Sequence, residues 1–179
     1  MVMEAATLGG GRFWLTEAVF QHIRGVRSTQ VGYAGGSEAF PYFEIVCTGQ
    51  TGHAEVVSLT FDSDVVSYAS LLEVFFKIHD AALDEHYSAT GLSPHRSIIF
   101  FHSTEQKRTA QLVLKRMQRS TQQSLTTELL AFGAFHTAED EHQNFYKNNR
   151  TSPFCAEIIA PKIAEARSIF KKPYSTFAA

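Results

Sequence analysis

The sequence predicts a single domain, residues 1–179, that mixes helices and strands in two layers, as either an α/β or an α+β fold. The first observation is size, because 179 residues suit one domain and a 44% hydrophobic content allows a sizeable core. The second is periodicity: strand-like stretches interleave with stretches whose apolar residues recur near the helical period of about 3.6. The third is that these stretches have uneven lengths and no internal repeat, which leaves both classes open.

The N-terminal half carries five such stretches, which we expect to be a strand, a helix, two strands and a helix, at residues 5–8, 13–23, 26–34, 54–61 and 67–79. The first strand is apolar and ends at three glycines, and the first helix stops before Gly25, a common helix-ending residue. The next two strands are bounded by turns, and the second is rich in β-branched residues. The last helix is amphipathic, with an apolar face made by Leu71, Leu72, Phe75 and Phe76.

The C-terminal half is expected to hold a loop, a strand, a helix, a strand and two helices, at residues 80–94, 96–101, 104–122, 126–135, 138–149 and 161–170. Small and polar residues fill the loop, whereas the first strand is bulky and apolar. Ser103 or Thr104 is the expected N-cap of the long helix. The next helix, over 138–149, has acids at its start and Lys147 near its end, which fit the helix dipole. We expect the last helix to lie on the surface.

Composition argues against several classes of function. A net charge of −2 and a pI near 6.4 give no basic surface for nucleic acid. Apolar stretches fall well short of the ~20 residues of a membrane span, and the N-terminus has no signal-peptide pattern. Two cysteines and scattered histidines give no metal-ligand spacing. We therefore expect a cytoplasmic monomer without metal or cofactor, unless a targeting segment precedes this N-terminus.

Two motifs can carry chemistry. Gly9-Gly10-Gly11-Arg12-Phe13-Trp14 lies where a strand ends and a helix begins, a turn that presents a side chain beside free helix N–H groups. A thiol there would be reactive, but Arg12 offers only donors; the simpler interpretation is a solvent-facing arginine on a glycine-rich loop. The second motif, residues 47–55, enters a strand at Glu55, which either points into a cleft as an acid or lies at the strand edge in water.

These motifs resemble those of the A-type methionine sulfoxide reductases (peptide-methionine (S)-S-oxide reductases). Residues 9–14 are similar to the family's Gly-Cys-Phe-Trp signature, and residues 47–55 to its Cys-Thr-Gly-x-Thr-Gly-His-Ala-Glu. Residues 32–36, 138–143 and 159–162 also match family elements, so the resemblance covers roughly residues 5 to 170. It implies an α+β two-layer sandwich with a ferredoxin-like core, the peptide methionine sulfoxide reductase fold.

The resemblance also implies a site. In that family a cysteine thiolate attacks the sulfoxide sulfur, a protonated glutamate protonates the oxygen, two tyrosines and an aspartate hold the oxygen and water, and Phe-Trp packs the methyl group. Here Phe13 and Trp14 keep the aromatic pocket and Glu55 keeps the acid. The positions that differ are Arg12 for the nucleophile, Phe43 and His95 for the tyrosines, and Thr90 for the aspartate. Tyr42, next to Phe43, replaces the lost hydroxyl only if the backbone shifts.

The remaining thiols offer no obvious substitute. Cys47 and Cys155 occupy positions where the family often has non-catalytic cysteines, and we expect each to be a buried structural thiol. No cysteine follows Cys155, so the C-terminal resolving pair of many members is absent. We also expect Arg12 to pair with Glu55, because a guanidinium placed in the site needs an anionic partner.

Three functions remain open, so whether the chain is an enzyme is undecided. The first is a family member that has lost thiol-dependent reduction, a pseudoenzyme that keeps a pocket for a methionine-containing peptide or small molecule. The second is an enzyme with non-thiol chemistry built on Arg12, Glu55 and His95, in which Arg12 binds an anion and the other two move protons. The third is residual peptide-methionine (S)-S-oxide reductase activity through another thiol.

Overall fold

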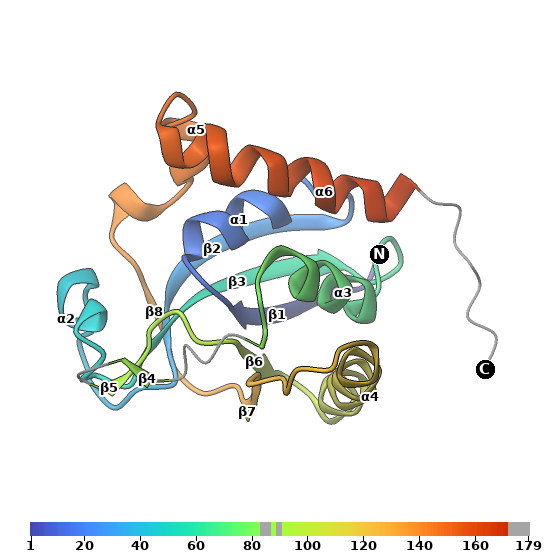
Figure 1. The fold of residues 1–179 in the computed structure, drawn as a ribbon, viewed down its shortest axis with the longest axis horizontal. Coiled ribbons are helices and arrows are strands. Elements are labelled where there is room, and N and C mark those ends of the chain that lie inside the picture. Colours follow the sequence, from blue (N-terminus) through green and yellow to red (C-terminus); the bar gives the residue numbers. More distant parts are fainter. Residues whose placement is uncertain (83–86, 89–90, 172–179) are drawn as a thin grey trace.

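The computed structural model describes residues 1–82, 87–88 and 91–171, which form a curved sheet with helices packed on it (Figure 1). The strands of the described residues are β1 Met3–Gly9, β2 Val26–Ala34, β3 Ala54–Asp62, β4 Tyr87–Ser88, β5 Gly91–Leu92, β6 Ile98–Phe101, β7 Glu128–Ala131 and β8 Phe135–Thr137. The helices are α1 Phe13–Phe20, α2 Phe43–Cys47, α3 Tyr68–Ile78, α4 Thr104–Ser120, α5 Phe145–Asn148 and α6 Ala160–Lys171.

The main sheet has the strand order β7-β6-β1-β3-β2-β8, and all of its pairs are antiparallel except β6 with β7. Its central four strands are joined in chain order through α1 and α3, as β1-α1-β2-β3-α3-β6, and lie side by side as β6-β1-β3-β2. This is the ferredoxin-like arrangement. The expected α+β sandwich is therefore confirmed, and α/β is excluded because the central strands are antiparallel.

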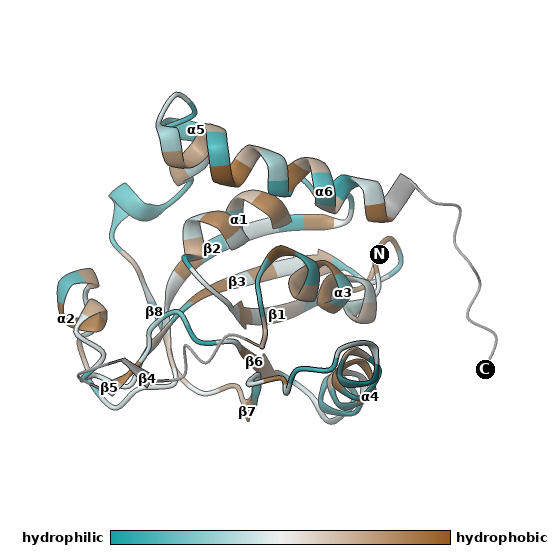
Figure 2. Cartoon of the chain, viewed as in Figure 1, coloured by the Kyte–Doolittle hydropathy of each residue, from teal (hydrophilic) through white to brown (hydrophobic). Residues whose placement is uncertain are grey.

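Successive residues of β3 divide the interior into two clusters. Val57, Leu59 and Phe61 join the large core beneath α1, α3 and α6, whereas Ala54 and Val56 join a smaller cluster on the other face of the sheet. This follows from the period of two along a strand. Figure 2 shows hydrophobic colouring on α1 and α3 and hydrophilic colouring along much of α4. The large core and the helices around it lie on one face of the sheet. Glu55 precedes Val57 by two residues in β3, so its side chain points toward that same face.

Side-chain caps fix the start of two helices where the sequence predicts them. The Ser67 hydroxyl accepts a hydrogen bond from the Ser70 backbone N–H at 3.1 Å, and Ser103 accepts one from Gln106 at 3.1 Å. Such a cap contributes about 1 kcal/mol to helix stability. Ser103, rather than Thr104, is thus the N-cap of α4.

Several predicted elements are wrong in extent. The helix predicted over 13–23 ends at Phe20, and α2 was not predicted. The strand predicted over 126–135 is two strands, β7 and β8, which lie at opposite edges of the sheet. The helix predicted over 138–149 is a 3-10 turn, Asp140–His142, followed by α5, because Asn144 adopts a left-handed conformation with φ of 55°. The last helix is not merely superficial, since its Ile163 and Ala166 are buried in the core.

Candidate functional site

The site begins at the turn between β1 and α1. Gly11 has a positive φ of 72°, which allows the chain to turn sharply after β1 without the strain that a side chain would bring. Arg12 follows in an extended conformation as the N-cap residue of α1, but its side chain does not cap the helix. The turn therefore directs the Arg12 side chain outward from the helix start and leaves the first N–H of α1, that of Phe13, available to another group.

Glu55, at the second residue of β3, is that group and is fully buried. Its Oε2 accepts the Phe13 backbone N–H at 3.1 Å. Its Oε1 accepts a hydrogen bond from Arg12 Nη1 at 3.4 Å and lies 3.0 Å from His95 Nε2. Glu55 is thus not a strand-edge residue in water. Each of its oxygens is contacted by a group that can only donate.

The Arg12 guanidinium lies over two aromatic rings as well as beside the acid. Its central carbon is 5.6 Å from the ring centre of Trp14 and 5.9 Å from that of Phe43. Both distances are within the usual range for cation–π contact, which contributes about 0.5–1 kcal/mol at exposed sites. The side chain remains 40% exposed, so the interpretation of a purely solvent-facing arginine is wrong, and the expected pairing with Glu55 is confirmed at 3.4 Å.

Aromatic side chains from four separate segments form the floor of the site. The Trp14 ring stacks on Phe145 at 4.2 Å and on Phe43 at 5.9 Å, and Phe43 packs against His142 at 4.3 Å. Phe13 is buried beneath this layer. His142 and Phe145 were not predicted as site residues, although the position of His142 within the matched segment 138–143 was a signal that could have found it.

Glu139 holds Phe43 in place. Its Oε1 accepts the Phe43 backbone N–H at 2.8 Å, and its Oε2 accepts the Tyr33 hydroxyl at 2.7 Å. Burial and the neighbouring Glu139 carboxylate raise the pKa of Tyr33 well above its usual value, so Tyr33 stays a neutral donor. Both residues lie in the matched segments 32–36 and 138–143, but the sequence did not show that they meet, because their contact joins segments more than 100 residues apart.

The other residues considered from sequence lie in different surroundings. His95 is at the site through its contact with Glu55, whereas Thr90 lies outside the described residues. Tyr42 is 48% exposed and lines a surface groove with Phe40, and nothing in its described contacts brings its hydroxyl to Glu55. The structure therefore brings together six of the seven candidate residues: Arg12, Phe13, Trp14, Phe43, Glu55 and His95.

The two cysteines differ from each other. Cys155 is buried, as expected, but Cys47 is exposed at the end of α2, so the expectation of a second buried thiol is wrong. Partial burial of the thiol and the nearby Glu55 carboxylate raise the pKa of Cys47, and the positive charge of Arg12, together with a hydrogen bond from it, opposes this in part. The sequence could not reveal that Cys47 is exposed, because α2 has only five residues and so carries no clear helical period of apolar positions.

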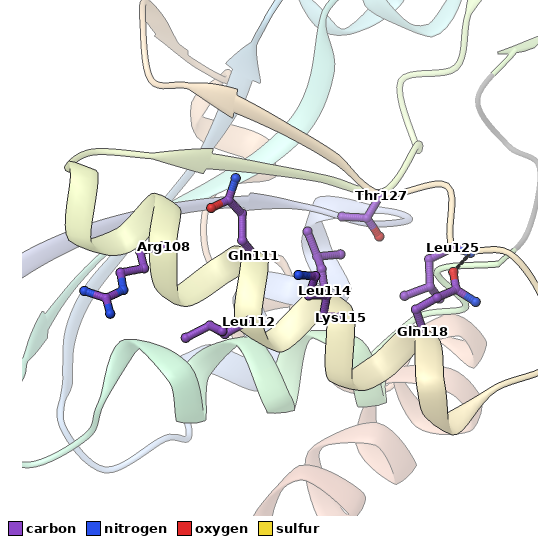
Figure 3. Close-up of a pocket in the computed structure, with 8 residues that line it drawn as sticks. All are labelled: Arg108, Gln111, Leu112, Leu114, Lys115, Gln118, Leu125 and Thr127. Carbon is purple, nitrogen blue, oxygen red and sulfur yellow. Dashed lines mark hydrogen bonds between the residues drawn. The ribbon is translucent and has the colours of Figure 1, made fainter. Parts of the chain in front are cut away.

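Among the described residues, no group of three or more His, Cys, Asp or Glu side chains could hold a metal ion, and no helix is long and apolar enough to cross a membrane. A hollow of about 540 Å³ lies along α4, away from the aromatic floor, and Leu112, Leu114 and Leu125 contribute its apolar lining (Figure 3). Its rim holds Arg108 and Lys115 but no acid.

Comparison with known proteins matches the chain to a described family. The profile of the family described as peptide methionine sulfoxide reductase matches residues 4–174. The chain is 48% identical over 161 residues to the peptide methionine sulfoxide reductase MsrA of Sulfolobus acidocaldarius, covering 90% of this chain and 92% of the relative. It is 42% identical to the protein of the same name from Thermus thermophilus, covering 96% of this chain and 97% of that one.

Solved structures agree with these sequence matches. The reduced form of Mxr1 from Saccharomyces cerevisiae superposes with a TM-score of 0.78 at 25% identity, covering 86% of this chain and 90% of that chain. Methionine sulfoxide reductase A of Corynebacterium diphtheriae gives a TM-score of 0.74 at 27% identity, covering 84% of this chain and 76% of that chain.

Proposed function

The chain belongs to the peptide methionine sulfoxide reductase family, and we propose that it binds methionine-containing peptides without reducing their sulfoxides through a thiol. The relatives are named for reduction of peptide methionine sulfoxide, which gives the ligand class. The proposal concerns the reaction step, because Arg12 occupies the position expected for the nucleophile.

The pairing of Arg12 with Glu55 is the observation that carries the proposal. A guanidinium stays protonated and has no lone pair with which to attack sulfur, so covalent catalysis cannot begin at this position. The same side chain and the Phe13 N–H place obligate donors on the two oxygens of Glu55. An acid held in this way is poorly placed to donate a proton to a sulfoxide oxygen. The pair thus removes both chemical partners of the family reaction.

The surviving surface supports binding. Trp14 and Phe43 present ring faces suited to the methyl and thioether of a methionine side chain. Arg12 supplies donors beside those rings, which suit the strongly accepting oxygen of a sulfoxide, and His95 lies next to Glu55 in the same site. Since the Arg12 side chain is 40% exposed and its contact with Glu55 is 3.4 Å long, the guanidinium can turn toward a ligand while the Phe13 N–H and His95 stay on the buried carboxylate.

A second candidate function rests on the 3.0 Å contact between His95 and Glu55. An imidazole hydrogen-bonded to a buried carboxylate is an arrangement that moves protons in many enzymes, and Arg12 would hold an anionic substrate beside it. Turnover of an anionic substrate that is lost in both Arg12→Ala and His95→Ala, and retained in Cys47→Ser, would favour this function over binding alone.

The test is a reductase assay with an S-sulfoxide peptide and dithiothreitol on wild-type protein, Arg12→Cys and Arg12→Ser. We expect no thiol-dependent turnover in wild-type protein or Arg12→Ser, and measurable turnover in Arg12→Cys, because the rest of the aromatic pocket is present. Wild-type turnover that disappears in Cys47→Ser would establish residual reductase activity through Cys47 and overturn the proposal. Binding is measured separately, by the fluorescence of Trp14, the single tryptophan of the chain.

A further inference from the structure

A groove of about 450 Å³ lies beside the candidate site, between residues 39–42 and strand β8. It is lined by that segment together with His136, Thr137 and Glu139, and it is called the β8 groove below. Figure 1 shows α2, which follows residues 39–42 directly, at the same end of the sheet as β8. None of these groove residues is part of the aromatic floor described above.

Strand β8 is an edge strand, and its pairing with β2 leaves one side open. The Ala138 N–H donates to the Val31 carbonyl, so the alternation of antiparallel pairs directs the His136 backbone toward β2. By the same alternation, the N–H and C=O groups of Phe135 and Thr137 face away from the sheet. Within the described part of the chain these groups have no backbone partner. Outward-facing main-chain groups of this kind are what an added strand pairs with.

The opposite wall of the β8 groove is aromatic and exposed. The Phe40 side chain is 84% exposed and that of Tyr42 is 48% exposed. Two neighbouring exposed aromatic side chains beside an open strand edge are an unusual combination for a surface without a partner, because rings of this size contribute strongly to binding when covered.

Glu139 connects this groove to the site. The same carboxylate that lines the β8 groove accepts the backbone N–H of Phe43, whose ring is part of the aromatic floor. Tyr42 and Phe43 are adjacent in sequence, with Tyr42 in the groove and Phe43 against Trp14. A chain lying in the groove therefore runs past the entrance of the pocket proposed for methionine.

We propose that the β8 groove binds the main chain of an extended peptide as an added strand, next to the methionine that enters the aromatic site. The peptide pairs with the outward groups of Phe135 and Thr137, and Phe40 and Tyr42 cover an apolar side chain that neighbours the methionine. This inference rests on the proposed function and deepens it. The ligand class becomes an unfolded or extended polypeptide segment rather than a free amino acid.

The hollow along α4 is the competing surface for such a peptide. It contains an exposed apolar side chain, Leu112, but no open strand edge among its lining residues and no residue that contacts the aromatic site. A peptide bound there would not present its methionine to Trp14. Leu112→Ala is therefore a matched control for removal of an exposed apolar side chain.

The experiment compares N-acetyl-methionine amide with a seven-residue capped peptide that has a central methionine, both titrated against wild-type protein by Trp14 fluorescence. We expect the peptide to bind at least ~10-fold more tightly, an advantage that Phe40→Ala and Tyr42→Ala reduce and Leu112→Ala does not. The affinity for the capped amino acid should stay the same in all three variants, because neither groove residue belongs to the floor.

Peptides N-methylated at single positions test the strand pairing itself. Methylation at alternate residues should weaken binding roughly fivefold or more, and methylation at the residues between them should not, because only alternate N–H groups face β8. Equal affinity of the peptide and the capped amino acid, or loss of the peptide advantage in Leu112→Ala alone, would overturn the groove and leave the proposed function intact. Failure of both ligands to bind would overturn the proposed function as well.

Discussion

The Arg12 guanidinium lies 3.4 Å from the buried Glu55 carboxylate, a longer contact than the 3.0 Å that separates Glu55 from His95. Arg12 is 40% exposed and His95 is 26% exposed, so water screens the first pair more strongly. The two neighbours of Glu55 should therefore differ in how much each contributes to the stability of the fold.

Double-mutant cycles should detect this difference. We expect a coupling free energy below ~1 kcal/mol between Arg12→Ala and Glu55→Gln, and a larger one, about 1–2 kcal/mol, between His95→Ala and Glu55→Gln. The measurement is urea unfolding of each single and double variant, followed by Trp14 fluorescence. A stronger coupling for Arg12 than for His95 would mean that the guanidinium is a structural partner of Glu55 and does not move aside easily.

The two cysteines should react at very different rates with a maleimide. Cys47 is exposed and Cys155 is buried, so one equivalent of label should enter the native protein and the second only after unfolding. The thiolate is the reactive form, so the raised pKa of Cys47 means that the labelling rate should still increase as the pH rises above neutral. Arg12 lowers this pKa, so Arg12→Ala should raise it further and slow the labelling of Cys47. Mass spectrometry of Cys47→Ser is the control; rapid labelling of that variant would show that Cys155 is accessible.

Backbone crowding gives a third prediction, at Gly36. A Cβ there would meet His53 Nδ1 and the Thr51 carbonyl, and the His53 ring is buried. Gly36→Ala should therefore lower the free energy of unfolding by more than ~2 kcal/mol, as overpacking does elsewhere. Gly133→Ala is the matched control, since a Cβ there meets nothing within 4 Å, and its effect should stay within about 0.5 kcal/mol. Similar losses in both variants would contradict the packing described at Gly36.

Local signals account for the elements that the sequence predicted well. The strand predicted over 26–34 has those bounds in the structure, and α3 and α4 begin after the serines that cap them. Period, capping and turn residues all act within a few positions, so a single sequence carries them. The positions of Arg12 and Glu55 in one pocket came instead from the resemblance of two motifs to one family.

Tertiary contacts decided the elements that the sequence predicted poorly. Residues 126–135 read as one apolar strand, yet β7 pairs with β6 and β8 pairs with β2, at opposite edges of the sheet. No local pattern encodes that separation. Similarly, the stacking of Trp14 on Phe145 and the bond from Tyr33 to Glu139 join residues more than 100 positions apart. Periodicity within a short window does not predict such pairs.

The last prediction concerns the pH dependence of stability and rests on His79. Its ring is held by the Phe75 carbonyl at Nδ1, 2.7 Å away, and by the Ser97 hydroxyl at Nε2, 2.8 Å away. Burial lowers the pKa of His79 to about 4, although the Phe75 carbonyl acts in the opposite direction. In the unfolded chain the pKa returns to about 6.5, so between these values the unfolded state binds the extra proton and acid favours unfolding. Stability supplied by neutral His79 is thus complete above pH ~6.5 and should fall by about 3 kcal/mol as the pH drops to 4.

The variant His79→Gln tests this prediction. In it this fall in the free energy of unfolding with pH should vanish, even if the variant is less stable at every pH. Urea unfolding of both proteins from pH 8 to 4 gives the difference directly. Parallel curves for the two proteins would show that the pKa of His79 is the same in the folded and the unfolded chain.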